Sequence, residues 1–203
     1  MFKIAVLISG SGTNLQSIID NIKDGYLKNC TIEYVISDKK DVFGLKRAKE
    51  NNIKTMVFDK NELKEDLSCN ILKFLKGKVD LIVLAGFTSI LKENIIDEFR
   101  NKIINIHPSL IPSFCGKGMY GLKVHEAVIE YGVKVSGCTV HFVDHGTDTG
   151  SIIIQKVIDV KSTYSAKESQ QEVLKIEHKA LPEAIKLISE GRIKIDKRKV
   201  IVS

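Results

Sequence analysis

The chain has 203 residues, of which 43% are hydrophobic and 28% are charged, a balance typical of a soluble globular protein with a buried core. Its net charge of +6 favours anionic ligands such as phosphates, but the lysines are dispersed among acidic residues, so no nucleic-acid-binding surface is predicted. No apolar run is long enough to cross a bilayer, and the four cysteines form no CxxC pair. We therefore expect a cytoplasmic protein with reduced thiols, without a membrane partner and without a metal.

Short apolar runs alternate with amphipathic stretches along the first part of the chain. The apolar runs predict strands at 3–8, 31–37, 53–58, 79–85 and 102–106. The stretches between them predict helices at 15–22, 43–51, 62–76 and 90–100. This succession predicts an α/β fold with a mostly parallel, doubly wound (Rossmann-like) sheet and helices on both faces.

The second part of the chain has a different pattern. It predicts a helix at 121–131, strands at 134–143 and 151–160 that form an antiparallel part, and two short β-like runs after Gly191. Ser165 and Glu168 predict a capping box at the start of a long helix that reaches about residue 189. Pro182 is expected to kink or divide that helix.

A glycine-rich segment, Ser9-Gly10-Ser11-Gly12-Thr13-Asn14-Leu15, follows the first predicted strand. Its glycines permit a tight turn, and the N-terminus of the next helix offers N–H groups that suit a phosphate. The spacing is not GxGxxG, and residues 37–40 are a poor match to a ribose-binding acidic residue, so a single phosphate fits better than a dinucleotide. From position alone, a plain strand-to-helix turn is an equally good interpretation.

Asn105 and His107 lie two residues apart at the end of a predicted strand, so their side chains point the same way. The carboxyl ends of parallel strands are where α/β sheets place their ligands. Pro108 and Pro112 stiffen the turn that follows. An amide and an imidazole in this arrangement can stabilise an oxyanion, although a buried, hydrogen-bonded polar pair is the plainer alternative.

Residues 140–150 combine ionisable side chains with turn residues. An aspartate held near a histidine in a partly dry loop can relay protons. The spacing of His141 and His145 does not predict a metal site, because such a pair shares a face only on a helix. Asp144 is interpreted as a loop cap, and Glu177, on the long helix, is by itself an ordinary polar residue.

Taken together, these segments resemble the phosphoribosylglycinamide formyltransferase family of folate-dependent enzymes, over essentially the whole chain. The matching segments are 8–15, 84–87, 105–112, 116–121 and 147–150. The element Asn-x-His-Pro-Ser-Leu-x-Pro is specific to folate formyltransferases, and the glycine-rich start and short length narrow the resemblance to this family. It implies transfer of a formyl group from 10-formyltetrahydrofolate, as co-substrate, to the amine of glycinamide ribonucleotide in de novo purine synthesis.

The resemblance also implies residue roles. Asn105, His107 and Asp148 match the catalytic residues, and His125 and His141 fall at family-typical positions with supportive roles. The acceptor and its phosphate are assigned to Gly12, Thr13, Asn14 and Glu177. The folate pocket is assigned to Phe87, Thr88, Ser89, Ile90, Leu91, Val143, Asp144, His145, Gly146 and Thr147.

The same resemblance implies one formyltransferase domain, 1–203. Its phosphate-binding Rossmann-like half is 1–100, and its catalytic and folate-binding half is 101–203. The expected partners are small molecules, and the protein is a monomer or a homodimer. The sequence departs from the family at Cys115, where Pro is usual, at Ser89, where some members carry Arg, and at Asp159, where Pro is common.

Two alternatives stay open. One is a folate-dependent formyltransferase that acts on another amine, either an amino sugar nucleotide or aminoacyl-tRNA; the tRNA enzymes carry a further C-terminal domain, for which the residues after Gly191 leave no room. The other is a non-catalytic nucleotide-binding module or a dehydrogenase, suggested by Gly10 and Gly12. That alternative leaves the set of Asn105, His107 and Asp148 unexplained.

Overall fold

The computed structural model describes residues 1–203, apart from the side chain of Glu93. The chain forms two compact units, Met1–Asn105 and Ile106–Ser203. The single domain expected over 1–203 stays a prediction. Among the described residues, no helix is both long and apolar enough to cross a membrane.

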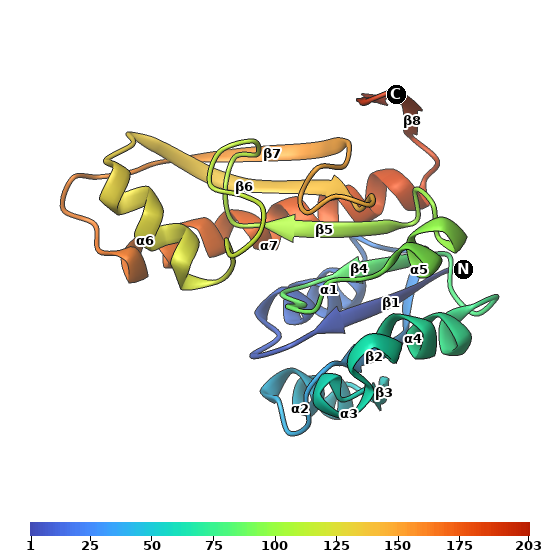
Figure 1. Ribbon diagram of the computed structural model, residues 1–203. Coiled ribbons are helices and arrows are strands. Elements are labelled where there is room, and N and C mark those ends of the chain that lie inside the picture. The colour runs from blue at the N-terminus through green and yellow to red at the C-terminus, as the bar shows by residue number, and fades with distance from the viewer. The chain divides into compact units, whose positions relative to one another are not determined.

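Parallel strands form the centre of the first unit (Figure 1). They are β1 (Phe2–Ile8), β2 (Cys30–Ser37), β3 (Lys54–Val57), β4 (Leu81–Leu84) and β5 (Ile103–His107), the last of which crosses the unit boundary. β1 pairs with both β2 and β4, and β4 pairs with β5. Every residue of β4 and most of β1 is buried, which accounts for their unbroken apolar sequences.

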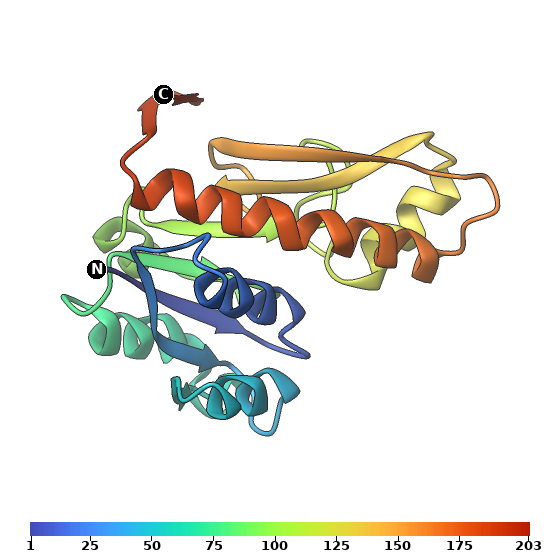
Figure 2. The same ribbon diagram turned by 180° about the vertical axis from the view of Figure 1, so that it is seen from behind.

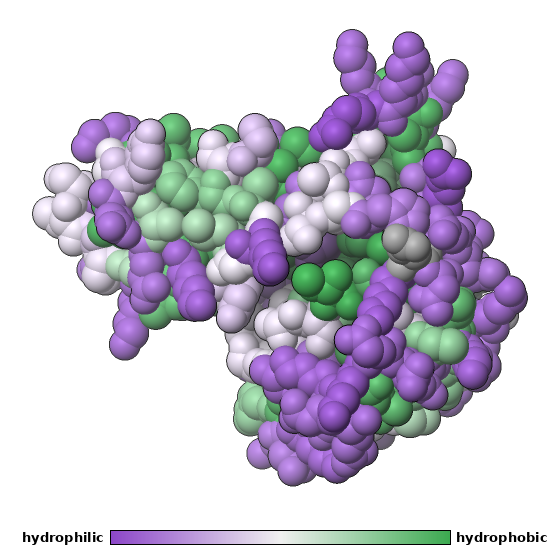
Figure 3. Space-filling view, viewed as in Figure 1, coloured by the Kyte–Doolittle hydropathy of each residue, from purple (hydrophilic) through white to green (hydrophobic). Residues whose placement is uncertain are grey.

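The helices of the first unit are α1 (Thr13–Lys23), α2 (Phe43–Glu50), α3 (Lys60–Leu63), the 3₁₀ helix η1 (Lys64–Asp66), α4 (Leu67–Leu75) and α5 (Glu93–Glu98). The single helix predicted at 62–76 is therefore wrong. Lys64 has a φ of 45°, which breaks the helix, and neither α3 nor η1 buries a residue. α4 begins where buried side chains begin, and Figure 3 shows a largely hydrophilic surface over α2 and α3.

The second unit contains α6 (Leu122–Tyr131), β6 (Val135–Phe142), β7 (Ile152–Asp159), α7 (Ala166–Ser189), β8 (Ile193–Asp196) and β9 (Lys199–Val202). β6 and β7 are antiparallel, and α7 packs along both strands and against α6 (Figure 2). The strand order is β3-β2-β1-β4-β5-β6-β7, while β8 and β9 form a separate two-stranded sheet. The predicted fold class, mostly parallel with an antiparallel C-terminal part, is confirmed.

The long helix α7 begins with the predicted capping box and continues without division to Ser189. The expectation that Pro182 divides the helix is wrong. Proline in a helix interior removes a hydrogen bond, at a cost of about 3 kcal/mol. Its neighbours Ala180, Leu181, Ala184 and Ile185 are fully buried, and this burial outweighs the lost bond.

Replacing Ser165 tests the cap. The Ser165 side chain accepts from the Glu168 N–H at 3.3 Å, and the Glu168 carboxylate accepts from the Ser165 N–H at 2.7 Å. We expect Ser165→Ala to lower the free energy of unfolding by about 1 kcal/mol, measured by urea denaturation. The control Ser162→Ala changes an exposed serine outside the cap, and an equal loss in both variants would contradict the capping role.

Candidate active site

The loop that follows β1 has a backbone that only glycine suits at position 12. Gly12 has a φ of 70°, and a Cβ there would lie 2.7 Å from the Cα of Gly44. α1 begins directly afterwards, and its first hydrogen bond runs from the Gln16 N–H to the Gly12 carbonyl at 2.9 Å. The N–H groups that precede Gln16 are outside the helix's own ladder, and such groups suit an anion.

Side chains link the loops that follow β1, β2 and β4 within the first unit. The Thr88 N–H donates to Ser9 Oγ at 2.8 Å, and Ser89 Oγ donates to Asp38 Oδ2 at 2.6 Å. Lys60 Nζ lies 3.8 Å from the same carboxylate, and Asp38 is fully buried. These contacts hold the carboxyl ends of three parallel strands together, at the edge where α/β sheets place ligands.

The segment predicted to line the folate pocket in this unit, 87–91, has mixed exposure. Leu91 is buried, Phe87 is half-buried, and Ile90 is 71% exposed. The exposed Ile90 gives this loop an apolar side chain that is open to a ligand. Thr88 and Ser89 hold the loop in place through the contacts just described.

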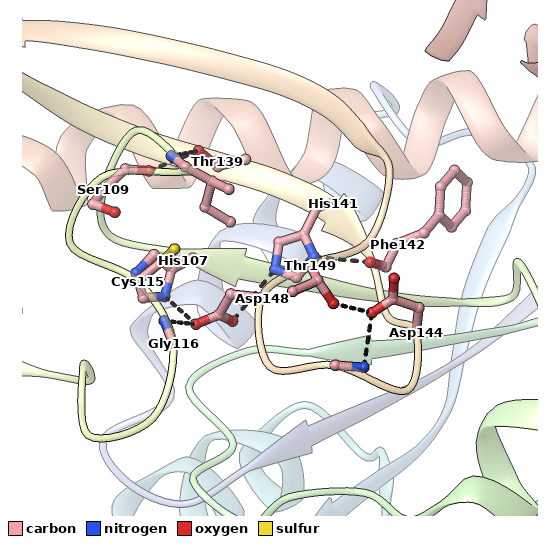
Figure 4. Close-up of polar contacts among 12 residues, drawn as sticks. His107, Ser109, Cys115, Gly116, Thr139, His141, Phe142, Asp144, Asp148 and Thr149 are labelled. Carbon is pink, nitrogen blue, oxygen red and sulfur yellow. Dashed lines mark hydrogen bonds and ion pairs between the residues drawn. The ribbon is translucent and has the colours of Figure 1, made fainter. Parts of the chain in front are cut away.

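In the second unit, Asp148 lies between two imidazole rings (Figure 4). Its Oδ2 is 3.6 Å from His107 Nδ1, and its Oδ1 is 3.6 Å from His141 Nε2. The Gly116 N–H also donates to Oδ2 at 2.9 Å. The structure thus brings together His107, Asp148 and the family-typical His141 from β5, the loop after β6, and β6 itself.

The remaining nitrogen of each ring faces a backbone carbonyl. His107 Nε2 lies 2.9 Å from the Phe114 oxygen, and His141 Nδ1 lies 2.8 Å from the Phe142 oxygen. A carbonyl oxygen only accepts, so each of these nitrogens carries a hydrogen. On His107, the nitrogen that faces Asp148 is therefore the one that gains or loses a proton.

The surroundings of His107 and Asp148 give the two side chains different charges at neutral pH. Burial lowers the pKa of His107, against the opposing effects of the Phe114 carbonyl and the Asp148 charge. Burial alone would raise the pKa of Asp148, but the adjacent His141 ring, the hydrogen bond from the Gly116 N–H and the nearby His107 lower it overall. At neutral pH the carboxylate is ionised and the His107 ring is mainly neutral.

The other predicted residues lie on defined elements. Asn105 is half-buried on β5, two residues before His107, so the two side chains share a face of that strand. Glu177 is buried on α7. Asp144 accepts from the Gly146 N–H and from Thr149 Oγ1, which is the loop cap expected from the sequence.

Neither nearby cysteine has the properties of a nucleophile. Burial, and secondarily the charge of Asp148, raise the pKa of the Cys115 thiol. Burial, and then Glu177, raise the pKa of Cys138 to about 12. Both thiols are therefore protonated at neutral pH. Among the side chains that are described, no cluster of three or more His, Cys, Asp or Glu residues could hold a metal ion.

Several groups at these sites carry no signal in the sequence. The Phe114 carbonyl and the Gly116 N–H are backbone groups, which any residue supplies. The sequence around Asp38 suggests at most a ribose-binding residue, and the contact of Asp38 with Ser89 joins positions 51 residues apart. Arg47 donates to the Ser11 carbonyl at 2.9 Å, and its place on a charged helix gave no indication of that contact.

Comparison with known proteins gives a consistent result. The model of the formyl transferase family matches residues 2–185. Phosphoribosylglycinamide formyltransferase from Haemophilus influenzae is 40% identical over 96% of this chain and 91% of that protein. The chloroplastic protein of the same name from Arabidopsis thaliana is 39% identical over 95% of this chain and 67% of that protein.

A solved structure agrees in fold. Glycinamide ribonucleotide transformylase 1 from Symbiobacterium toebii superposes with a TM-score of 0.93 at 38% identity, over 100% of this chain and 94% of that one. Some relatives are much longer: the chain spans 14% to 19% of the trifunctional purine biosynthetic proteins that it matches.

His125 makes the stability of the protein depend on pH. The side chain is 1% exposed on α6, with Nδ1 3.4 Å from Ser169 Oγ. Burial, and then the charge of His107, lower the pKa of His125 to about 4. Because the folded pKa lies below the unfolded value of about 6.5, stability is fully present above pH 6.5 and is lost as pH falls toward 4.

We expect protonation of His125 to lower the free energy of unfolding of the wild type by about 2 to 3 kcal/mol when the pH falls from 7 to 4.5. His125→Gln should lose less over this range, whereas His145→Gln, at an exposed position, should behave as the wild type. Urea denaturation at the two pH values measures the difference. Equal pH dependence in all three proteins would rule out His125 as the cause.

Proposed function

This chain belongs to the formyl transferase family, and we propose that it transfers the formyl group of 10-formyltetrahydrofolate to the amine of glycinamide ribonucleotide in de novo purine synthesis. The observation that carries the proposal is the position of the Asp148 carboxylate between His107 and His141. Formyl transfer to an amine moves a proton from one nitrogen to another, and this arrangement supplies a base and a counter-charge for that proton.

We propose that each unit binds its own part of the substrates. In the first unit, the loop at Gly12, Thr13 and Asn14 binds the acceptor's phosphate, supported by the N–H groups at the start of α1. In the second, Glu177 binds the ribose or glycine end of the acceptor. The folate donor is assigned to the loops 87–91 and 143–147, in which Ile90 and residues 145–147 are exposed.

In the proposed reaction, the acceptor's amine attacks the formyl carbon and forms a tetrahedral centre with a negative oxygen. Asn105 donates a hydrogen bond to that oxygen. His107 begins neutral and accepts the proton of the attacking nitrogen, and the Asp148 carboxylate stabilises the imidazolium that forms. The imidazolium stabilises the oxyanion. The proton then passes to the folate nitrogen as its bond to the formyl carbon breaks.

No covalent intermediate on the protein enters this scheme, because the amine is already a nucleophile and both nearby thiols are protonated. We further propose that no metal takes part. The protein would act on small molecules in the cytoplasm, as a monomer or a homodimer.

A formyl-transfer assay tests the proposal directly. The protein is incubated with 10-formyltetrahydrofolate and one acceptor at a time: glycinamide ribonucleotide, an amino sugar nucleotide, or methionyl-tRNA. We expect turnover with glycinamide ribonucleotide alone. Turnover with either other acceptor and none with glycinamide ribonucleotide would overturn the assigned substrate.

Asp148→Asn and His107→Ala test the acid–base assignment. Loss of a positioned acid–base group lowers kcat by about two to four orders of magnitude, and we expect both variants to fall in or beyond this range. Asp159→Asn, which changes an exposed aspartate of the same unit, should keep wild-type turnover. Near-normal turnover by either site variant, with its circular dichroism spectrum intact, would refute the assigned role.

Gly12→Val tests the phosphate site. We expect the KM of glycinamide ribonucleotide to rise about tenfold, as for the loss of one charged hydrogen bond, with a smaller change for the folate. Gly25→Val is the matched control, because Gly25 has a similar φ of 76° and open space around it. It carries the same backbone strain and should leave both KM values unchanged. An equal rise in both KM values for Gly12→Val would argue against a phosphate site there.

A further inference from the structure

The helix α2 packs directly on the glycine-rich loop of the first unit. The Gly44 N–H donates to the Gly10 carbonyl at 3.0 Å. A Cβ on Gly44 would lie 3.1 Å from that oxygen and 3.2 Å from the Cα of Gly12, so the two backbones meet with no room for a side chain. The first turn of α2 therefore fixes the position of the loop.

Arg47 lies one turn further along α2 and holds the same loop by its guanidinium group. Its Nε donates to the Ser11 carbonyl at 2.9 Å, and its Nη1 donates to Gln16 Oε1 on α1 at 3.3 Å. The guanidinium lies over the ring of Phe43, 4.8 Å from its centroid. A planar group held by a carbonyl, an amide and an aromatic face has little freedom to reorient.

These contacts decide which way the loop's peptide groups point. Two successive carbonyls, those of Gly10 and Ser11, are turned toward α2. In a trans peptide the C=O and the N–H lie in one plane and point in opposite directions. The N–H groups of Ser11 and Gly12 are therefore turned away from α2. If the Ser11 peptide flipped, a carbonyl would replace an N–H on the side where an anion is proposed to bind.

We propose that Arg47 is a positioning residue for the acceptor's phosphate: it holds the Ser11 carbonyl against α2 so that the loop presents N–H groups to the phosphate. This inference rests on the proposed function, which assigns the phosphate to Gly12, Thr13 and Asn14. Arg47 acts through the loop, because its Nε donates to the Ser11 carbonyl and one Nη donates to Gln16 on α1. Its positive charge also favours an anion near the loop.

The inference is tested by removing the Arg47 side chain and the phosphate of the acceptor, each alone and both together. Formyl transfer is measured for the wild type and Arg47→Met, each with glycinamide ribonucleotide and with the same acceptor lacking its phosphate. We expect Arg47→Met to lower kcat/KM about tenfold for the ribonucleotide, mostly through KM. For the acceptor without phosphate, and for the KM of the folate, the variant should stay within about twofold of the wild type.

Lys46→Met is the matched control. Lys46 is the neighbouring cation on α2 and also lies over Phe43, 5.7 Å from the ring centroid, but it is exposed and pairs with Glu50. Its loss changes the net charge equally and should leave every constant within about twofold of the wild type. A tenfold effect in Lys46→Met would show that net charge, and not the hold on Ser11, is responsible, and would overturn the inference.

Arg47→Lys provides a second variant if Arg47→Met does not fold. It keeps the aliphatic stem and the charge but loses the planar donor group. The same phosphate-dependent loss, smaller in size, is expected. An equal loss with and without the phosphate, or no loss in a folded variant, would overturn the inference. Failure of the proposed function is recognised separately, because the wild type would then give no product from glycinamide ribonucleotide.

Discussion

The proposed chemistry of this protein depends on one mostly buried carboxylate. Asp148 can stay ionised because two imidazoles and the Gly116 N–H surround it, and its lowered pKa reflects that balance. An isolated carboxylate at this depth would take up a proton. The same charge stabilises a proton on His107, whose burial otherwise favours the neutral ring. The ring of His107 thus starts neutral and able to accept a proton, as the proposed attack by a neutral amine requires.

In the first unit, the proposed phosphate site requires that the loop's N–H groups, and not its carbonyls, face the ligand. Its glycine-rich loop contacts α2 so closely that neither Gly12 nor Gly44 has room for a Cβ. The carbonyls of Gly10 and Ser11 accept hydrogen bonds from Gly44 and Arg47 of α2. In this unit, the proposed preference for an anion comes from the direction of the backbone N–H groups, and side chains such as Arg47 fix that direction.

Much of the fold follows from local sequence. Apolar periodicity predicted every strand of the seven-stranded sheet, and Ser165 and Glu168 predicted the start of α7. Two predictions were wrong, the single helix at 62–76 and the division of the long helix at Pro182, and tertiary burial is the cause of both. The segment 62–76 has helical spacing, but its first residues bury nothing, so the chain turns at Lys64 before α4 begins. Pro182, in contrast, stays within a helix because its surroundings are buried. Tertiary burial overrode local preference in both directions.

The sequence by itself determined which side chains are available for catalysis: an amide and an imidazole two residues apart on a strand, an aspartate in a polar loop, and glycines before a helix. The tertiary structure alone decided that His141 joins His107 at Asp148, that the Phe114 carbonyl selects the titrating nitrogen, and that Arg47 reaches Ser11. The physical reason is that some of these contacts join distant positions, as between His107 and Asp148 or Arg47 and Ser11, and others use backbone groups that every residue has. Their geometry exists only after the strands and helices have packed.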